Sequence, residues 1–105
     1  MRQLQVIPKA GYRLYGAMVA KEVELKRKNQ GTFRRSASKE KNRAKWTHSR
    51  HSGWINLKRG MGEVVQLEVK SKKEDTEWQL FHAILGFIDR HYADRIRAVN
   101  IQYGD

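Results

Sequence analysis

The sequence predicts an α+β domain in which helices pack on an antiparallel sheet as a two-layer sandwich. Three observations predict this fold class. Several short runs alternate apolar and polar side chains, one segment near the carboxyl end has the apolar period of a helix, and 105 residues suit one domain with one core. We therefore expect residues 1–105 to form a single domain built from helix packed on sheet.

Four strands are expected from period-two alternation. In 54–58 and 65–70 every second side chain is apolar, which is the pattern of a strand with one buried face. Two glycines between these runs favour a tight reversal, so the runs are expected to form a hairpin. Residues 3–6 and 98–103 alternate in the same way and add one strand near each end of the chain.

Residues 76–92 are expected to form a long helix that begins near Thr76. Its apolar side chains fall on two adjacent helical stripes, which together are wider than one sheet face can cover. Something else must then cover the remainder. We expect either a second helix of the same chain or the identical helix of a second subunit, which would make the protein a homodimer.

Residues 10–28 admit two interpretations. One helical stripe of apolar residues and two Glu–Lys pairs four residues apart favour a helix, whereas Gly11, Gly16 and a turn sequence near residue 30 leave two strands open. With a helix the order is βαββαβ, which resembles the ferredoxin-like sandwich with the basic residues inserted before the central hairpin. With two strands the domain is an antiparallel meander covered by one long helix.

A third layout follows if residues 44–50 add a strand beside 54–59. Helix, three strands and helix are then consecutive, which is similar to the double-stranded RNA-binding domain. The sequence Ser-Lys-Lys-Glu at 71–74 precedes the last helix much as a Ser-Lys-Lys signature does in that family, where the lysines contact phosphates. The resemblance covers about half of the chain, and the family's alanine-rich final helix has no equivalent here.

The net charge of +11 is confined to one third of the chain. Twelve lysines and arginines and a single acid, Glu40, lie between Lys26 and Arg59, whereas the remaining sequence is charge-balanced. Because such an excess repels itself unless an anion is present, residues 26–59 are interpreted as a basic segment that binds a polyanion.

Aromatic rings are interleaved with the cations of this segment. Cations neutralise phosphates and flat rings stack bases, so the combination favours nucleic acid, with RNA ahead of DNA because no convincing recognition helix is present. Trp54 is expected on the sheet face opposite the core, and packing is the alternative role for both Trp46 and Trp54. The predicted nucleic-acid-binding residues are Arg34, Arg35, Lys39, Lys41, Arg43, Lys45, Trp46, His48, Arg50, Trp54 and Lys58.

An enzymatic role has only weak candidates. His48 and His51 supply two ligands where zinc needs three or four, and Glu40 is the only carboxylate nearby, so neither a metal site nor a cofactor is predicted. General acid–base chemistry by these histidines on RNA would make a metal-free endoribonuclease, similar to the small basic toxins that cut messenger RNA. The other alternative is an interaction module that dimerises through the 76–92 helix and docks an acidic protein.

The expected location is the cytoplasm. The sequence has no cysteine, which fits a reducing compartment, and no apolar run approaches the roughly 20 residues of a membrane span. No membrane partner is therefore expected.

Overall fold

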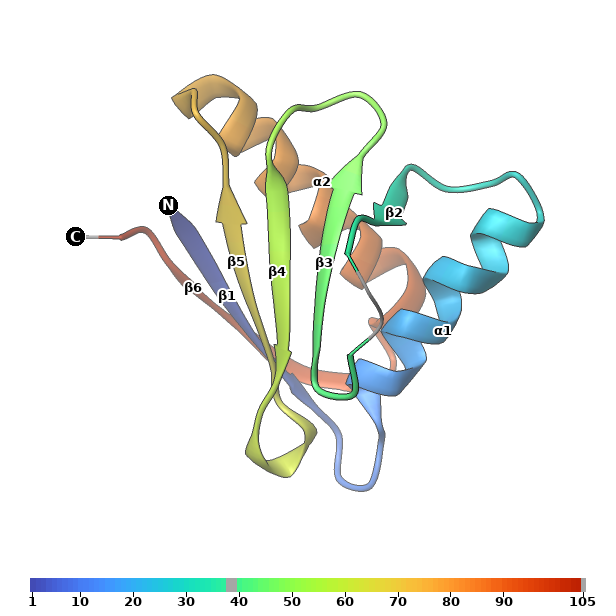
Figure 1. The fold of residues 1–105 in the computed structure, drawn as a ribbon. Coiled ribbons are helices and arrows are strands. Elements are labelled where there is room, and N and C mark those ends of the chain that lie inside the picture. Colours follow the sequence, from blue (N-terminus) through green and yellow to red (C-terminus); the bar gives the residue numbers. More distant parts are fainter. Residues whose placement is uncertain (38–39, 105) are drawn as a thin grey trace.

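The computed structural model describes residues 1–37 and 40–104, which form a six-stranded antiparallel sheet with two helices (Figure 1). The α+β class is confirmed. Neighbouring strands follow the order β2-β3-β4-β5-β1-β6 across the sheet. Along the chain the elements are β1 (Arg2–Pro8), α1 (Leu14–Arg27), β2 (Phe33–Arg35), β3 (Arg43–His48), β4 (Trp54–Arg59), the short 3₁₀ turn η1 (Met61–Glu63), β5 (Val65–Lys70), α2 (Glu74–Tyr92) and β6 (Ile96–Gln102).

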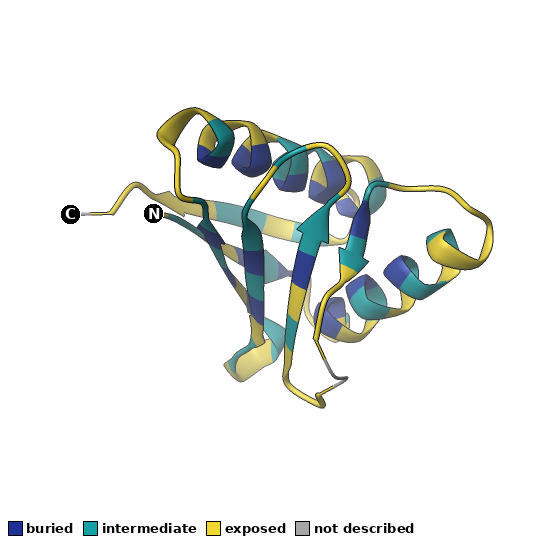
Figure 2. Cartoon of the chain, turned by 45° about the horizontal axis from the view of Figure 1, so that its top comes forward, coloured by how far each residue is buried: buried dark blue, intermediate teal, exposed yellow. Residues whose placement is uncertain are grey.

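The core lies between the sheet and the helices. Along β4 and β5 buried side chains alternate with less buried ones, as the period-two pattern predicts, and Figure 2 shows the same alternation on the ribbon. In β3 the buried side chain is Trp46, which has no exposed surface. In β3, β4 and β5 the buried side thus packs toward the helices, and the other side points away from them.

The order of the elements differs from each predicted layout. The four predicted strands correspond to β1, β4, β5 and β6, and residues 14–27 form a helix, so the two-strand alternative for residues 10–28 is wrong. The basic segment adds two more strands, since β2 and β3 extend the sheet beyond β4. Strand β3 pairs with β4 and corresponds to the strand that the third layout placed at residues 44–50. The order is therefore βαββββαβ, where the ferredoxin-like layout has four strands and the double-stranded RNA-binding layout has three strands between helices.

Helix α2 begins at Glu74, two residues before the predicted Thr76, and most of its apolar arc is covered within the chain. Strands β2 and β3 place Phe33 and Trp46 against Phe87, with ring centroids 5.7 and 5.5 Å apart in edge-to-face contact. At its carboxyl end the Tyr92 hydroxyl donates a hydrogen bond to the Ala17 carbonyl of α1 at 3.0 Å. Trp78, near the start of the arc, is 52 % exposed, and the homodimer stays a prediction.

Candidate nucleic-acid interface

One face of the sheet is not covered by either helix. Figure 1 looks onto this face, with α2 behind the strands. We call it the open face. Because side chains alternate along a strand, the residues between the buried ones of each strand must lie on it. Whatever binds the sheet from this side meets polar side chains first.

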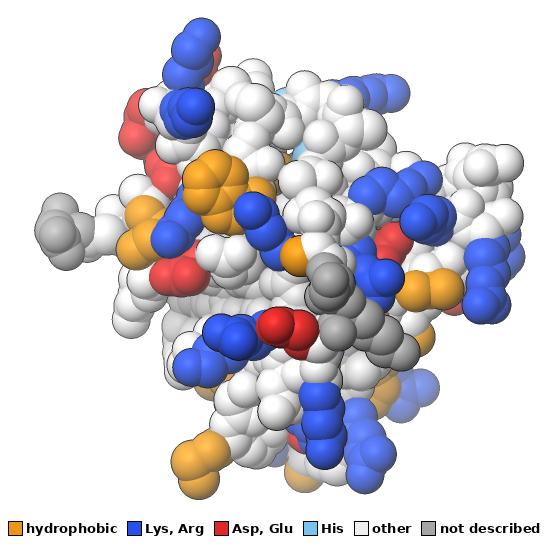
Figure 3. Space-filling model, in the orientation of Figure 1, with side chains coloured by type: hydrophobic (Ala, Val, Ile, Leu, Met, Phe, Trp, Pro, Cys, Tyr) orange, Lys and Arg blue, Asp and Glu red, His pale blue; other side chains and the backbone are white. Residues whose placement is uncertain are grey.

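The strands β2 to β5 place five cations and one tryptophan on the open face. We call this part the cationic half. In Figure 3 lysine and arginine side chains lie on both sides of a hydrophobic cluster on this face. Residues 43 and 58 face each other across β3 and β4, and residues 54 and 70 do so across β4 and β5. The cationic half consists of Arg34, Arg43, Lys45, Trp54, Lys58 and Lys70.

Cross-strand register arranges the open face in rows. One row runs from Arg43 through Lys58, Gln66 and Gln5 to Asn100, with each residue opposite the next. Adjacent strands lie about 4.8 Å apart, so the five side chains span about 19 Å. The row changes from cations on β3 and β4 to amides on β5, β1 and β6.

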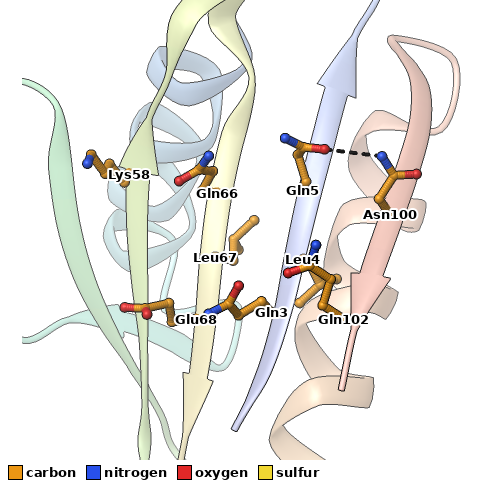
Figure 4. A pocket seen from close by; sticks show the side chains of 9 residues that line it. All are labelled: Gln3, Leu4, Gln5, Lys58, Gln66, Leu67, Glu68, Asn100 and Gln102. Carbon is orange, nitrogen blue, oxygen red and sulfur yellow. Dashed lines mark hydrogen bonds between the residues drawn. The ribbon is translucent and has the colours of Figure 1, made fainter. Parts of the chain in front are cut away.

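The neutral part of the open face contains a shallow hollow of about 320 Å³ (Figure 4). Gln5 and Asn100 are linked across β1 and β6 by a hydrogen bond of 3.1 Å, in which the Asn100 amide donates. Amides both donate and accept hydrogen bonds, as base edges require. We call this part the amide half, which consists of Gln3, Gln5, Gln66, Asn100 and Gln102.

Trp54 lies on the open face at the start of β4, as predicted, and is half-buried. The Nζ atom of Lys45 is 5.1 Å from the centroid of its ring, and Lys70 is its partner on β5. Gly53, the residue before Trp54, lies very close to β5. A Cβ at this position would be 2.3 Å from the Lys70 carbonyl oxygen. The ring thus lies beside the Lys45 ammonium, with Lys70 opposite it on the next strand, on a face that is otherwise polar.

Trp46 belongs to the core, and the predicted role in stacking bases is wrong for it. It has no exposed surface, and its ring packs against Phe33 at 5.8 Å and against Phe87. Its neighbours on the strand, Lys45 and Thr47, take the opposite side. Trp46 therefore supports β3 from below the interface without contacting a ligand.

Five of the predicted cations have another role, another place or lie outside the described residues. Arg34 donates hydrogen bonds to the carbonyls of Phe33 at 2.8 Å and Gln30 at 3.1 Å, so its guanidinium also braces the turn into β2. Arg35 and Lys41 line a groove against α1, away from the open face. Arg50 is exposed in the loop between β3 and β4. Lys39 lies outside the described residues.

The structure places His48 and His51 next to each other, with their rings stacked. Their rings are 4.6 Å apart and 23° from parallel, and His48 also packs on Phe33 at 4.9 Å. Burial, followed by the charges of His51 and Arg50, lowers the pKa of His48, so this ring is largely neutral at pH 7. Its Nδ1 accepts the Arg50 backbone N–H at 3.0 Å. An acid and a base for phosphodiester cleavage would have to flank the scissile bond, and stacked rings do not.

Metal ligands are not grouped in the part of the chain that the structure describes. Within 1–37 and 40–104 no three histidine, cysteine or acidic side chains are placed to hold an ion together. In the same residues no helix is long and apolar enough to cross a membrane.

Comparison with family models, curated protein sequences and solved structures finds no significant match to this chain.

Substitution can distinguish a base-stacking role of Trp54 from a packing role. If it stacks a base, Trp54→Ala is expected to weaken binding of a single-stranded RNA oligomer by about 1–3 kcal/mol and to leave thermal stability nearly unchanged. The control is Trp78→Ala, because Trp78 is a surface tryptophan that is 52 % exposed and lies on α2, away from the open face. Fluorescence anisotropy and thermal melting measure the two effects. A loss of folding stability of about 3–5 kcal/mol in Trp54→Ala would instead identify a core residue.

Proposed function

We propose that this protein binds single-stranded nucleic acid, RNA ahead of DNA, through the open face. The observation that carries the proposal is the cationic half, in which five cations and a half-buried tryptophan share one sheet face with Glu68, while a second acid, Glu40, pairs with Arg43 and lines the same hollow as Glu68. Lysine and arginine neutralise phosphates and release their counterions, while an aromatic ring accepts a base by stacking.

The shape of the surface favours single strands. A duplex is usually read by a helix or a two-stranded ribbon that enters a groove, whereas a broad sheet offers no such projection. Unpaired bases can instead lie flat on the sheet and expose their edges to side chains. The amide half, which adjoins the cationic half in the same rows, supplies donors and acceptors for those edges.

The metal-free endoribonuclease is not favoured. His48 and His51 stack on each other beside Phe33, whereas the cations that would hold an RNA backbone belong to the open face. Binding of an acidic protein remains the alternative, and the charge-reversal variants discussed below distinguish it. The cytoplasmic location stays a prediction.

Binding is expected to weaken steeply with salt. Five phosphate contacts, one for each cation of the cationic half, correspond to a slope of about −3.5 in a plot of log affinity against log salt concentration. Titrations of a mixed-sequence RNA, the same sequence in DNA and the corresponding duplex at several salt concentrations measure this slope. Single strands should bind more tightly than the duplex. A slope shallower than about −2 for every oligomer would contradict the electrostatic interface.

A further inference from the structure

Glu68 is an acid in the middle of a surface that we propose binds a polyanion. It lies on β5 between Asn56 of β4 and Gln3 of β1, its partners in the cross-strand register. The hollow of the amide half and a second hollow over the cationic half share two side chains, Lys58 and Glu68. Glu68 therefore stands where the two halves of the open face meet.

The carboxylate of Glu68 is not neutralised by any described residue. No ion pair or hydrogen bond within 1–37 and 40–104 reaches it, although Lys58 and Lys45 lie on the same face. Its side chain is only half-buried, so water can solvate it in the free protein. A phosphate placed over it would be repelled, so the backbone of a bound strand must pass elsewhere on the face.

We propose that Glu68 is a specificity-determining residue that selects bases carrying an exocyclic amino group, namely adenine, cytosine and guanine, over uracil and thymine. This inference rests on the proposed function. A carboxylate accepts hydrogen bonds and donates none, so it pairs with amino groups such as N4 of cytosine or N6 of adenine. Uracil and thymine present the O4 carbonyl at the corresponding position, and two acceptors there repel each other. Guanine presents O6 at that position but carries its amino group at N2, which the carboxylate can reach from the other side of the same edge.

The neighbours of Glu68 suit this task. Gln3 and Asn56 flank it with amides, which can take up the remaining donors and acceptors of a base edge. Trp54 is two residues from Asn56 on the same side of β4, about 7 Å along the strand. A base stacked near Trp54 would thus have a polar edge within reach of the row that contains Glu68, while Lys45 and Lys58 remain for the backbone.

The test compares three RNA homopolymers of about ten nucleotides, oligo(A), oligo(C) and oligo(U), by fluorescence anisotropy. The wild-type protein is expected to bind oligo(A) and oligo(C) about tenfold more tightly than oligo(U). In Glu68→Gln the amide can donate to O4 as well as accept, so oligo(U) should gain affinity and the preference should fall to about threefold or less. Asp89→Asn, on the exposed side of α2, removes the same charge and should keep the wild-type preference.

The outcomes separate the two proposals. If the wild-type protein binds all three oligomers equally, or if Glu68→Gln tightens all three by the same factor, Glu68 acts only as a charge and the inference is overturned while nucleic-acid binding stands. If none of the oligomers binds in a salt-dependent manner, the proposed function fails, and the inference fails with it.

Discussion

Replacing Phe87 with lysine is expected to prevent the protein from folding. Phe87 is 5 % exposed and packs edge-to-face against Phe33 and Trp46, so it joins α2 to the two strands that the basic segment adds. Loss of the buried ring alone costs about 3–5 kcal/mol. A lysine ammonium at this depth adds several kcal/mol, and the sum is comparable to the whole stability of a typical domain, about 5–15 kcal/mol.

Circular dichroism and size-exclusion chromatography measure the result. The matched control is Trp78→Lys, which introduces the same charge on the same helix at a side chain that is 52 % exposed and should melt close to the wild-type temperature. A Phe87→Lys protein that melts cooperatively near that temperature with unchanged mass would mean that Phe87 is not a core residue, and the packing of β2 and β3 on α2 would have to be redrawn.

Three of the four strands that the sequence predicted, β1, β4 and β5, bury alternate residues on one face, whereas β6 was predicted from its alternation although none of its residues is fully buried. In β4 and β5, alternation continues over six residues, and a slip of one residue would exchange the two faces, so the pattern is unambiguous. Strand β2 has only three residues, Phe33–Arg35, which is too short for a period to be recognised. In β3 a single side chain, Trp46, is buried, and the surrounding cations obscure the alternation.

Helix α1 was ambiguous for a related reason. The sequence suggested a stripe through Tyr12, Tyr15, Val19 and Val23, whereas the apolar residues that α1 buries are Leu14, Tyr15 and Met18. Val19 and Val23 line the groove against Arg35 and Lys41 and are only half-buried. A helix that packs near one edge of the sheet buries a narrow face, and the apolar residues beside that face shift the apparent stripe.

The basic segment supplies most of the cations on the open face, but the sequence alone did not show how its residues divide between the two sides of the sheet. Arg34 and Arg35 are adjacent in a strand, so they point to opposite sides, and only Arg34 lies on the open face. The amide half was not predicted, because Gln and Asn are uncharged and do not contribute to a charge pattern. The signal was present in the sequence, since Gln5 and Gln66 are the polar partners in the alternation that predicted β1 and β5.

Reversing the charge of Arg43, Lys45 and Lys58 together to glutamate is expected to abolish binding of single-stranded RNA at moderate salt. All three side chains are exposed on β3 and β4. Arg43 pairs with Glu40 at 3.0 Å, but both partners are exposed, so the loss of this pair costs little stability. Each reversal removes an attraction to phosphate and adds a repulsion, so the affinity should fall by on the order of a hundredfold or more.

The matched control reverses Lys9, Arg13 and Arg90, three exposed cations outside the open face. Both variants change the net charge by the same six units, from +11 to +5, so their difference reports where the charges lie and not how many there are. The open-face variant should also lose about 2 units from the steepness of the salt dependence, since three phosphate contacts disappear, while the control keeps most of the wild-type slope. Equal losses in the two variants would mean that the protein attracts nucleic acid only by its total charge, and the open face would then be free for an acidic protein partner.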